Sequence, residues 1–195
     1  DGPLKPVYSV VPNLPLDEWI ATDLKGYHGD GPVRVGNAAV DQIQHDTYGS
    51  VILAALPLFF DRRLPTPAGE RLFHLLESLG AKASEVALKP DAGIWEYRGR
   101  QRVHTHSVAM CWAGVNRLGA IAARLGLQDR AAYWNAIADG IHKELIDKAW
   151  NPKREAFTAA FGSDDLDASV LLLPDLGVCE VDDPRFVKTV QIIER

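Results

Sequence analysis

The sequence has little cysteine, no excess of basic charge and no long apolar run. Its 195 residues include two cysteines, Cys111 and Cys179, without C-x-x-C spacing or a Cys/His cluster of zinc-binding type. We therefore expect two reduced thiols that behave as small apolar side chains. Reduced thiols suit a reducing compartment, so a cytoplasmic location is favoured, although the location itself stays open.

The charge balance and the apolar runs argue against two classes of partner. The formal net charge is −5 and the pI is near 5.7, whereas proteins that bind nucleic acid usually carry a basic stripe. No apolar run reaches the roughly 18 residues that span a bilayer. The first residues, D-G-P-L-K-P, lack the pattern of a signal or transit peptide. We expect neither a nucleic-acid partner nor a membrane partner.

What is present is the composition of a globular protein with helical periodicity. Hydrophobic residues make up 47% of the chain, which is enough for a sizeable core in one domain. Residues 1–36 contain many Pro and Gly and predict an irregular segment, with short strand pieces at 7–11. From Asn37 onward the apolar spacing is helical. Helices are expected over 37–58, 67–88, 105–125, 129–148, from 164 onward and over 184–195, with long loops at 89–103 and 149–163.

These helices, without a convincing sheet, predict an all-α fold. Short turns near 64 and 127 alternate with the two long loops, which is typical of stacked helical hairpins with function gathered at one end. Asn37, Asp129 and Asp183 are expected helix caps, and Gly126 is an expected helix end. Trp112 and Trp134 lie inside expected helices and are expected core residues. Residues at helical spacing lie at 40, 43, 47/48, 51, 54/55 and 58 in the first helix, and on one face at 72, 75, 76, 79 and 86 in the next.

One loop motif, D-A-G-I-W-E-Y-R-G at 91–99, sets a carboxylate beside a large aromatic ring. An exposed loop glutamate is the common interpretation of Glu96, and a catalytic acid is the alternative. A catalytic acid must hold a proton, and burial against apolar surface such as Trp95 and Ile94 favours the neutral carboxyl. A direct pair with Arg98 would act in the opposite direction.

Aromatic and polar residues near the loops are candidates for sugar binding. Trp95 and Trp150 fall in or beside the two long loops, where a sugar could stack on the indole rings. A polar cluster at the start of the first expected helix is either a solvated face or a lining that hydrogen-bonds sugar hydroxyls. The cluster consists of Arg34, Asn37, Gln42, Gln44, His45 and Asp46, of which Gln44 and Asp46 can accept or share such bonds.

The motif H-T-H-S at 104–107 brings histidines and hydroxyls to the start of a helix. His104 and His106 point in different directions on a helix, and no acidic residue that would complete a triad is evident from the sequence. Capping by Thr105 or Ser107 is therefore favoured over nucleophilic catalysis, and a metal site is weaker still.

Four segments, in order and in register, resemble the family 15 glycoside hydrolases. These are glucoamylase-like enzymes that include bacterial glucoamylases, glucodextranases and some trehalases. The resemblance covers the chain from about Gly26 to Arg195, and four motifs together are more specific than any one of them. The segments are R-V-G-N-A-A-V-D-Q-I-Q-H-D-T-Y-G, G-I-W-E-Y-R-G, H-T-H-S-V-A-M-C-W-A and L-D-A-S-V-L-L-L-P.

The resemblance implies an all-α fold of the (α/α)6 barrel type, of which this chain would hold about three helical hairpins. It also implies hydrolysis of α-glucosidic bonds in glucans or trehalose with inversion, without a cofactor. Glu96 stands at the position of the family's general acid, and Tyr97 stands where some members have a second acid. Trp95 and the stripe around Gln44 and Asp46 fall where the family lines its sugar pocket. Together with Arg34, Arg98 and Trp150, which are selected by their place in or beside the loops and the polar cluster, they are the candidate substrate-binding residues.

Inversion also needs a general base, which the family has at a Glu beyond the last residue of this chain. Asp164, Asp165 and Asp167 are better suited to helix capping. Residues 37–195 are therefore expected to form an incomplete toroid, the central part of a glucoamylase-like catalytic domain. Its open inner faces, including 51–58 and 170–173, would be covered by the rest of that domain or by self-association. A non-catalytic helical module that binds a saccharide or a protein is the alternative function.

Overall fold

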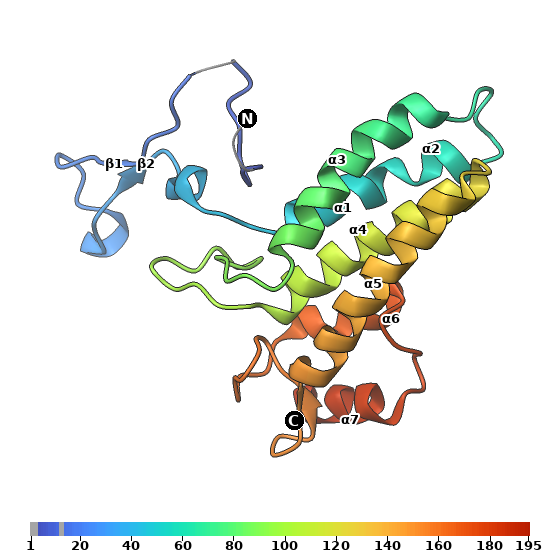
Figure 1. Cartoon of the computed structure of the whole chain (residues 1–195). Coiled ribbons are helices and arrows are strands. Elements are labelled where there is room, and N and C mark those ends of the chain that lie inside the picture. Colours follow the sequence, from blue (N-terminus) through green and yellow to red (C-terminus); the bar gives the residue numbers. More distant parts are fainter. Residues whose placement is uncertain (1–3, 12–13) are drawn as a thin grey trace.

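The chain is mostly helical, as the spacing of its apolar residues predicts. Figure 1 shows the computed structural model, which describes residues 4–11 and 14–195; residues 1–3 and 12–13 of the predicted irregular segment lie outside it. The all-α class is confirmed, and the long helices run side by side in alternating directions, as in part of an (α/α)6 barrel. The α-helices are α1 (Asp46–Ala55), α2 (Pro57–Phe60), α3 (Glu70–Val86), α4 (Thr105–Arg124), α5 (Gln128–Ala149), α6 (Leu173–Leu176) and α7 (Pro184–Ile193).

Helix α4 lies at the centre of the helical region. It packs against α1, α3 and α5, and its apolar residues Val108, Val115 and Leu118 are fully buried. Trp112 of α4 and Trp134 of α5 also lie in this core, as predicted. Because neighbours cover most of its surface, α4 is a firm support for the loop that precedes it.

The predicted start of the first helix at Asn37 is wrong. The Asn37 side chain does act as a cap, accepting a hydrogen bond from the backbone N–H of Ala39 (2.9 Å), but it caps only the 3-10 turn Ala38–Asp41. The backbone is then extended at Gln42, and α1 begins at Asp46. The polar residues that the sequence placed along one helix therefore divide between a turn, an extended stretch and the first turn of α1.

The apolar residues of α1 and α2 divide between an exposed and a buried set. Val51 and Leu58, on the face that the sequence predicted to lie open without the rest of the domain, are 40% and 43% exposed, whereas Tyr48, Ile52 and Phe59 are buried. Within α3 the predicted apolar face does meet the core, since Leu76 and Val86 are buried and Leu72 and Leu79 pack against it. Leu75 is the exception at 62% exposed, and Phe73, which was not predicted, is fully buried.

Two helix ends follow the predicted signals. Gly126, with φ of 80°, ends α4, and the Asp183 side chain caps α7 by accepting from the Arg185 backbone N–H (2.8 Å). The predicted cap at Asp129 is wrong, because α5 begins at Gln128 and no side chain caps it. The helix expected from 164 onward begins later, as the 3-10 helix Ala168–Leu172 capped by Asp167.

Two short antiparallel ladders were not predicted, and the strand expected at 7–11 is absent from the structure. Strand β1 (Trp19–Ile20) pairs with β2 (Arg34–Val35), and β3 (Trp150–Asn151) pairs with β4 (Ala156–Phe157). The first ladder lies in the N-terminal segment, away from the helices, and the second follows α5 (Figure 1). Each ladder ties together the two ends of a turn.

Part of the apolar segment 170–173, which was expected to lack partners, is buried within the chain. Within 170–173, Val170 and Leu173 are buried beside α4, and Leu172 is 41% exposed.

Both cysteines are free thiols, with Cys111 buried and Cys179 half-buried. Among residues 4–11 and 14–195, no helix combines the length and the apolar character that crossing a bilayer requires.

Candidate functional site

The motif at 91–99 belongs to a loop that is closed at its base, here called the Glu96 loop (residues 91–102). Asp91 and Arg102 form an antiparallel bridge, with N–H to O=C distances of 2.9 and 3.1 Å. The Asp91 carboxylate is fully buried and its Oδ2 accepts from the His45 backbone N–H and from the Ser107 hydroxyl, both at 2.8 Å. The Asp91 side chain therefore connects the Glu96 loop to the residue that precedes α1 and to the first turn of α4.

Within this loop Glu96 has a left-handed backbone with φ of 54°. This conformation is costly for a residue with a side chain and persists where surrounding contacts impose it. The Glu96 N–H donates to the Gly93 carbonyl (3.1 Å), and the Glu96 carbonyl accepts from Gln42 Nε2 (3.0 Å). Trp95 and Ile94 are exposed, and so is Glu96, so the expected burial of its carboxyl against them is not found.

A cavity of about 110 Å³ lies beside Trp95. The Trp95 indole N–H donates to Asp167 Oδ2 (2.7 Å), and the Tyr97 ring stacks on His104 with ring centres 5.9 Å apart. The cavity lining combines aromatic rings, imidazoles and carboxylates: Trp95, Tyr97, His104, His106, Asp165 and Asp167 are among its residues. Aromatic walls with a few convergent polar groups are typical of small-molecule binding sites.

Behind the cavity lies a buried polar cluster that spans the start of α1 and the start of α4. Gln44, His45 and Asp46 are all buried, so the alternative of a solvated face is wrong for them. Burial raises the pKa of Asp46, and the neighbouring His106 opposes that rise. Side-chain atoms in this region without a hydrogen-bond partner are Gln44 Nε2, His45 Nδ1, Asp46 Oδ1, Asp91 Oδ1, His104 Nε2 and His106 Nδ1.

Burial disfavours the protonated form of the histidines in this cluster. Burial lowers the pKa of His45, His104 and His106, while nearby carboxylates act in the opposite direction. Asp91 opposes the fall in pKa at all three histidines. The cluster is therefore a group of buried imidazoles and carboxyls with unused hydrogen-bonding capacity, and His104 and His106 also line the cavity.

The H-T-H-S motif does not cap α4. The Thr105 hydroxyl donates to the Thr158 carbonyl (2.6 Å) and the Ser107 hydroxyl donates to Asp91, while the cap residue is His104, which makes no side-chain cap bond. The acidic partner that the sequence left unidentified is Asp91. It lies 16 residues before Ser107, and its place at the foot of the W-E motif is the signal that could have found it.

Arg34 and Arg98 meet on one carboxylate. Glu18 accepts from Arg98 Nη1 and Nη2 (3.0 and 2.7 Å) and from Arg34 Nη1 (2.7 Å). The Arg98 hydrogen bond is the main reason why the pKa of Glu18 falls to about 2. Arg98 thus pairs with a residue that sequence reasoning did not select, and it does not form the direct pair with Glu96 that was considered above.

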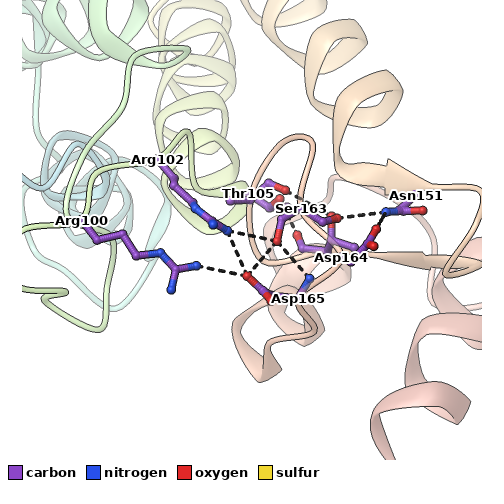
Figure 2. Close-up of polar contacts among 9 residues, drawn as sticks. Arg100, Arg102, Thr105, Asn151, Ser163, Asp164 and Asp165 are labelled. Atoms are coloured by element: carbon purple, nitrogen blue, oxygen red, sulfur yellow. Dashed lines mark hydrogen bonds and ion pairs between the residues drawn. The ribbon is translucent and has the colours of Figure 1, made fainter.

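A second polar network joins the Glu96 loop to the segment 158–167. Figure 2 shows Arg100 and Arg102 converging on Asp165 Oδ2, at 3.1 and 2.9 Å. The Ser163 hydroxyl accepts from Arg102 and donates to the same Asp165 oxygen. The Ser163 hydrogen bond is the largest of the contacts that lower the pKa of Asp165. Asp164 instead accepts from Asn151 Nδ2 (2.8 Å), so only Asp167 acts as the expected helix cap.

Trp150 is not brought together with the other predicted site residues. It lies in β3, partly buried, with its ring edge-on to Phe157 at 5.5 Å between ring centres. It is not among the residues that line the cavity beside Trp95. In the part of the chain that the structure describes, no three His, Cys, Asp or Glu side chains are arranged to hold a metal ion.

Comparison with known proteins agrees with the motifs. The chain is 33% identical to a trehalase of Thermoplasma volcanium over 195 residues and 37% identical to a trehalase of Mycobacterium tuberculosis over 191 residues. These alignments cover 100% and 98% of this chain but only 31% and 28% of the relatives, so the chain spans less than a third of their length. No solved structure matches the chain significantly.

The match to a protein family is equally extensive. The family model described as glycosyl hydrolases family 15 matches residues 4–195. It covers the Glu96 loop, the buried polar cluster and every α-helix of the structure. With the trehalases aligned along the same residues, this match shows that the chain belongs to the glycosyl hydrolases of family 15.

Proposed function

We propose that this chain is part of an inverting α-glycosidase whose substrate is trehalose, and that Glu96 is its general acid. The observation that carries the proposal is the setting of Glu96. Its backbone is held at φ of 54° by Gln42 and Gly93, in a loop whose Trp95 and Tyr97 line the cavity. Glu96 itself is exposed and is not among the residues that line this cavity, although both of its chain neighbours are. Strained backbone gathers at functional sites, and we propose that Glu96 reaches the oxygen of a glycoside bound beside Trp95 and Tyr97.

The proposed sugar pocket consists of Trp95, Gln44 and Asp46 together with His104 and His106. Trp95 offers an aromatic face for the C–H bonds of a sugar ring. The buried cluster offers hydrogen-bonding atoms that have no partner within the described chain, and sugar hydroxyls can both donate and accept. Arg34, Arg98 and Trp150 are left out of this pocket, because the two arginines are bound to Glu18 and Trp150 packs on Phe157.

The general base is proposed to come from protein sequence outside residues 1–195. An inverting mechanism needs a second carboxylate about 6.5–9.5 Å from the acid, with room for a water molecule. The carboxylates that line the cavity are already engaged, Asp165 with two arginines and Asp167 with Trp95 and a helix N-terminus. The trehalase relatives are more than three times as long as their aligned part, and residues 37–195 would then be one part of a larger (α/α)6 domain.

Trehalose is the preferred substrate because several relatives along the whole chain are described as trehalases. Maltooligosaccharides and isomaltooligosaccharides are the competing α-glucosides. The first test measures glucose release from all three by the intact protein that carries this chain, and reads the anomer of the product by proton NMR. We expect β-glucose from trehalose. Release of α-glucose would contradict inversion, and a preference for maltooligosaccharides would contradict the substrate.

The role of Glu96 is tested with Glu96→Gln, a nearly isosteric change. We expect hydrolysis to fall by about 10²–10⁴-fold, the usual contribution of a general acid, with unchanged thermal stability. Glu155→Gln is the matched control, since Glu155 is also an exposed glutamate with positive φ (52°) but lies at the β3–β4 turn. Full activity of Glu96→Gln would refute the assignment.

The same measurements separate the enzyme from a non-catalytic module. If the intact protein binds trehalose without cleaving it, a saccharide-binding module is the better description. If the 195-residue chain alone hydrolyses an α-glucoside, a general base lies within it, and Asp164, Asp165 and Asp167 would be the first residues to replace.

A further inference from the structure

The Glu96 loop carries more positive charge than its function as an acid would favour. Arg98, Arg100 and Arg102 follow Glu96 within six residues, and a cation close to a carboxyl favours loss of its proton. Each guanidinium is nevertheless paired with a carboxylate from another segment. Asp165 binds Arg100 and Arg102, and Glu18 binds Arg98.

The Glu18 side chain accepts more hydrogen bonds and is less exposed than is usual for a surface ion pair. Its side chain is only 11% exposed, against 57% for Arg98. Besides the two bonds from Arg98 and the one from Arg34, it accepts from the backbone N–H of Ala38 (3.3 Å). Glu18 directly precedes β1, and Arg34 belongs to the paired strand β2. Two parallel N–H···O bonds from one guanidinium define the orientation of Arg98.

We propose that Glu18 is a positioning residue for Glu96: it binds the Arg98 guanidinium and so leaves the Glu96 carboxyl free to hold and donate a proton. The inference rests on the proposed function, because only a general acid needs that proton. Arg98 is two residues from Glu96, and the charge of Glu96 contributes to the raised pKa of Arg98. Without Glu18, Glu96 is the nearest carboxylate along the chain to which Arg98 could turn.

The surroundings of Glu96 contain other charges, which remain in place when Glu18 is changed. Asp165 holds Arg100 and Arg102, and Gln42 Nε2 holds the Glu96 carbonyl, so the backbone has a fixed point of its own. The charged and titratable side chains in and around the Glu96 loop include Glu18, Arg34, Asp41, Asp91, Tyr97, Arg98, Arg100, Arg102, His104, His106, Asp165 and Asp167. Of the arginines in the loop, only Arg98 depends on Glu18.

The test is the pH profile of kcat/KM of the intact protein, which reports the groups of the free enzyme. Glu18→Gln removes the charge and keeps the shape. We expect its basic limb, where the acid loses its proton, to move down by about one pH unit, with activity above that limb about tenfold lower. Arg98→Gln alone should not move the limb down, and the double variant Glu18→Gln/Arg98→Gln should return it close to the wild-type pH.

A merely structural role for Glu18 would give a different result. The single variant would then lose activity equally at all pH values, and the double variant would be no better, which would overturn the proposal. A crystal structure of Glu18→Gln decides the point without activity. We expect the Arg98 guanidinium on the Glu96 carboxylate, and an Arg98 that turns to solvent would overturn the inference. If the wild-type protein cleaves no α-glucoside, the proposed function fails, while the crystal structure still tests the release of Arg98.

Discussion

Two glycines in the Glu96 loop have the same backbone conformation but different surroundings. Gly93 and Gly99 have φ of 70° and 67°, a region that glycine adopts without steric cost. A Cβ at Gly93 would lie 2.7 Å from Cδ2 of His104, whereas a Cβ at Gly99 would meet nothing within 4 Å. The pair therefore separates the effect of backbone strain from the effect of a clash next to the candidate site.

We expect Gly93→Ala to lower the free energy of unfolding by about 2–3 kcal/mol and to impair activity, because strain and displacement of the His104 ring act together. Gly99→Ala should cost about 1 kcal/mol from strain alone and leave activity nearly unchanged. Urea unfolding and glucose release from trehalose measure both effects. Equal losses in the two variants would show that contact with His104 has no role.

The residues of the candidate site were predictable from the sequence to different degrees. The W-E motif identified the Glu96 loop because its resemblance is local. Glu18 and Asp91 were missed, since each acts through partners far away in sequence: Glu18 binds Arg98 80 residues later, and Asp91 accepts from His45 46 residues earlier. Glu18 has no neighbours along the chain that mark its role, whereas Asp91 has one local signal, its place at the foot of the W-E motif.

At the scale of elements, the crossing of α1 and α4 depends on the absence of side chains. A Cβ at Gly49 would overlap the carbonyl oxygen of Met110, and a Cβ at Gly114 would lie 2.8 Å from the Cα of Gly49. The two helices can therefore approach closely only with glycine at these positions. This crossing brings His45 and Asp46, at the start of α1, beside the first turn of α4.

Gly49→Ala is expected to destabilise the protein by about 1–3 kcal/mol, because a well-packed crossing has no room for a methyl group. Gly140→Ala is the control within α5, where a Cβ meets nothing within 4 Å. That variant should gain about 0.5–1 kcal/mol from the better helix propensity of alanine. Thermal unfolding followed by circular dichroism compares them, and a stabilised Gly49→Ala would show that the crossing is looser than the structure indicates.

The elements themselves were predictable where periodicity and end signals agree. Helices α3, α4, α5 and α7 fall close to the predicted ranges, since long amphipathic runs end at Gly126 or begin at Asp183. The start of α1 was not predictable from its cap, because an Asn that caps a single 3-10 turn has the same local sequence as one that caps a long helix. What decides between them is the burial of Gln44 to Asp46 against α4, a tertiary effect.

For the whole molecule, the buried histidines link stability to pH. Burial lowers the pKa of His45, His104 and His106 in the folded state. As the pH falls below about 6.5, the unfolded chain takes up protons that the folded chain does not, so the free energy of unfolding decreases. The raised pKa of Asp46 acts in the opposite direction at lower pH, but it is one group against three.

We expect the free energy of unfolding to fall by about 1–3 kcal/mol between pH 7.5 and pH 5.5, as measured by urea titration at each pH. His104→Gln should reduce this slope, because it removes one of the three groups. A stability that does not change over this range would contradict the burial of the imidazoles.

The attachments of the Glu96 loop have a consequence for how the protein folds. Helices α4 and α5 are joined by a turn at Gly126 and can pair as soon as both exist. The Glu96 loop, in contrast, is held by distant partners: Arg98 binds Glu18, 80 residues earlier, and Trp95 binds Asp167, 72 residues later. Closing long stretches of chain costs entropy before any contact is gained, so distant contacts follow local ones. We therefore expect the candidate site to become organised after the pairing of α4 and α5, once the segments that carry Glu18 and Asp167 have packed beside these helices.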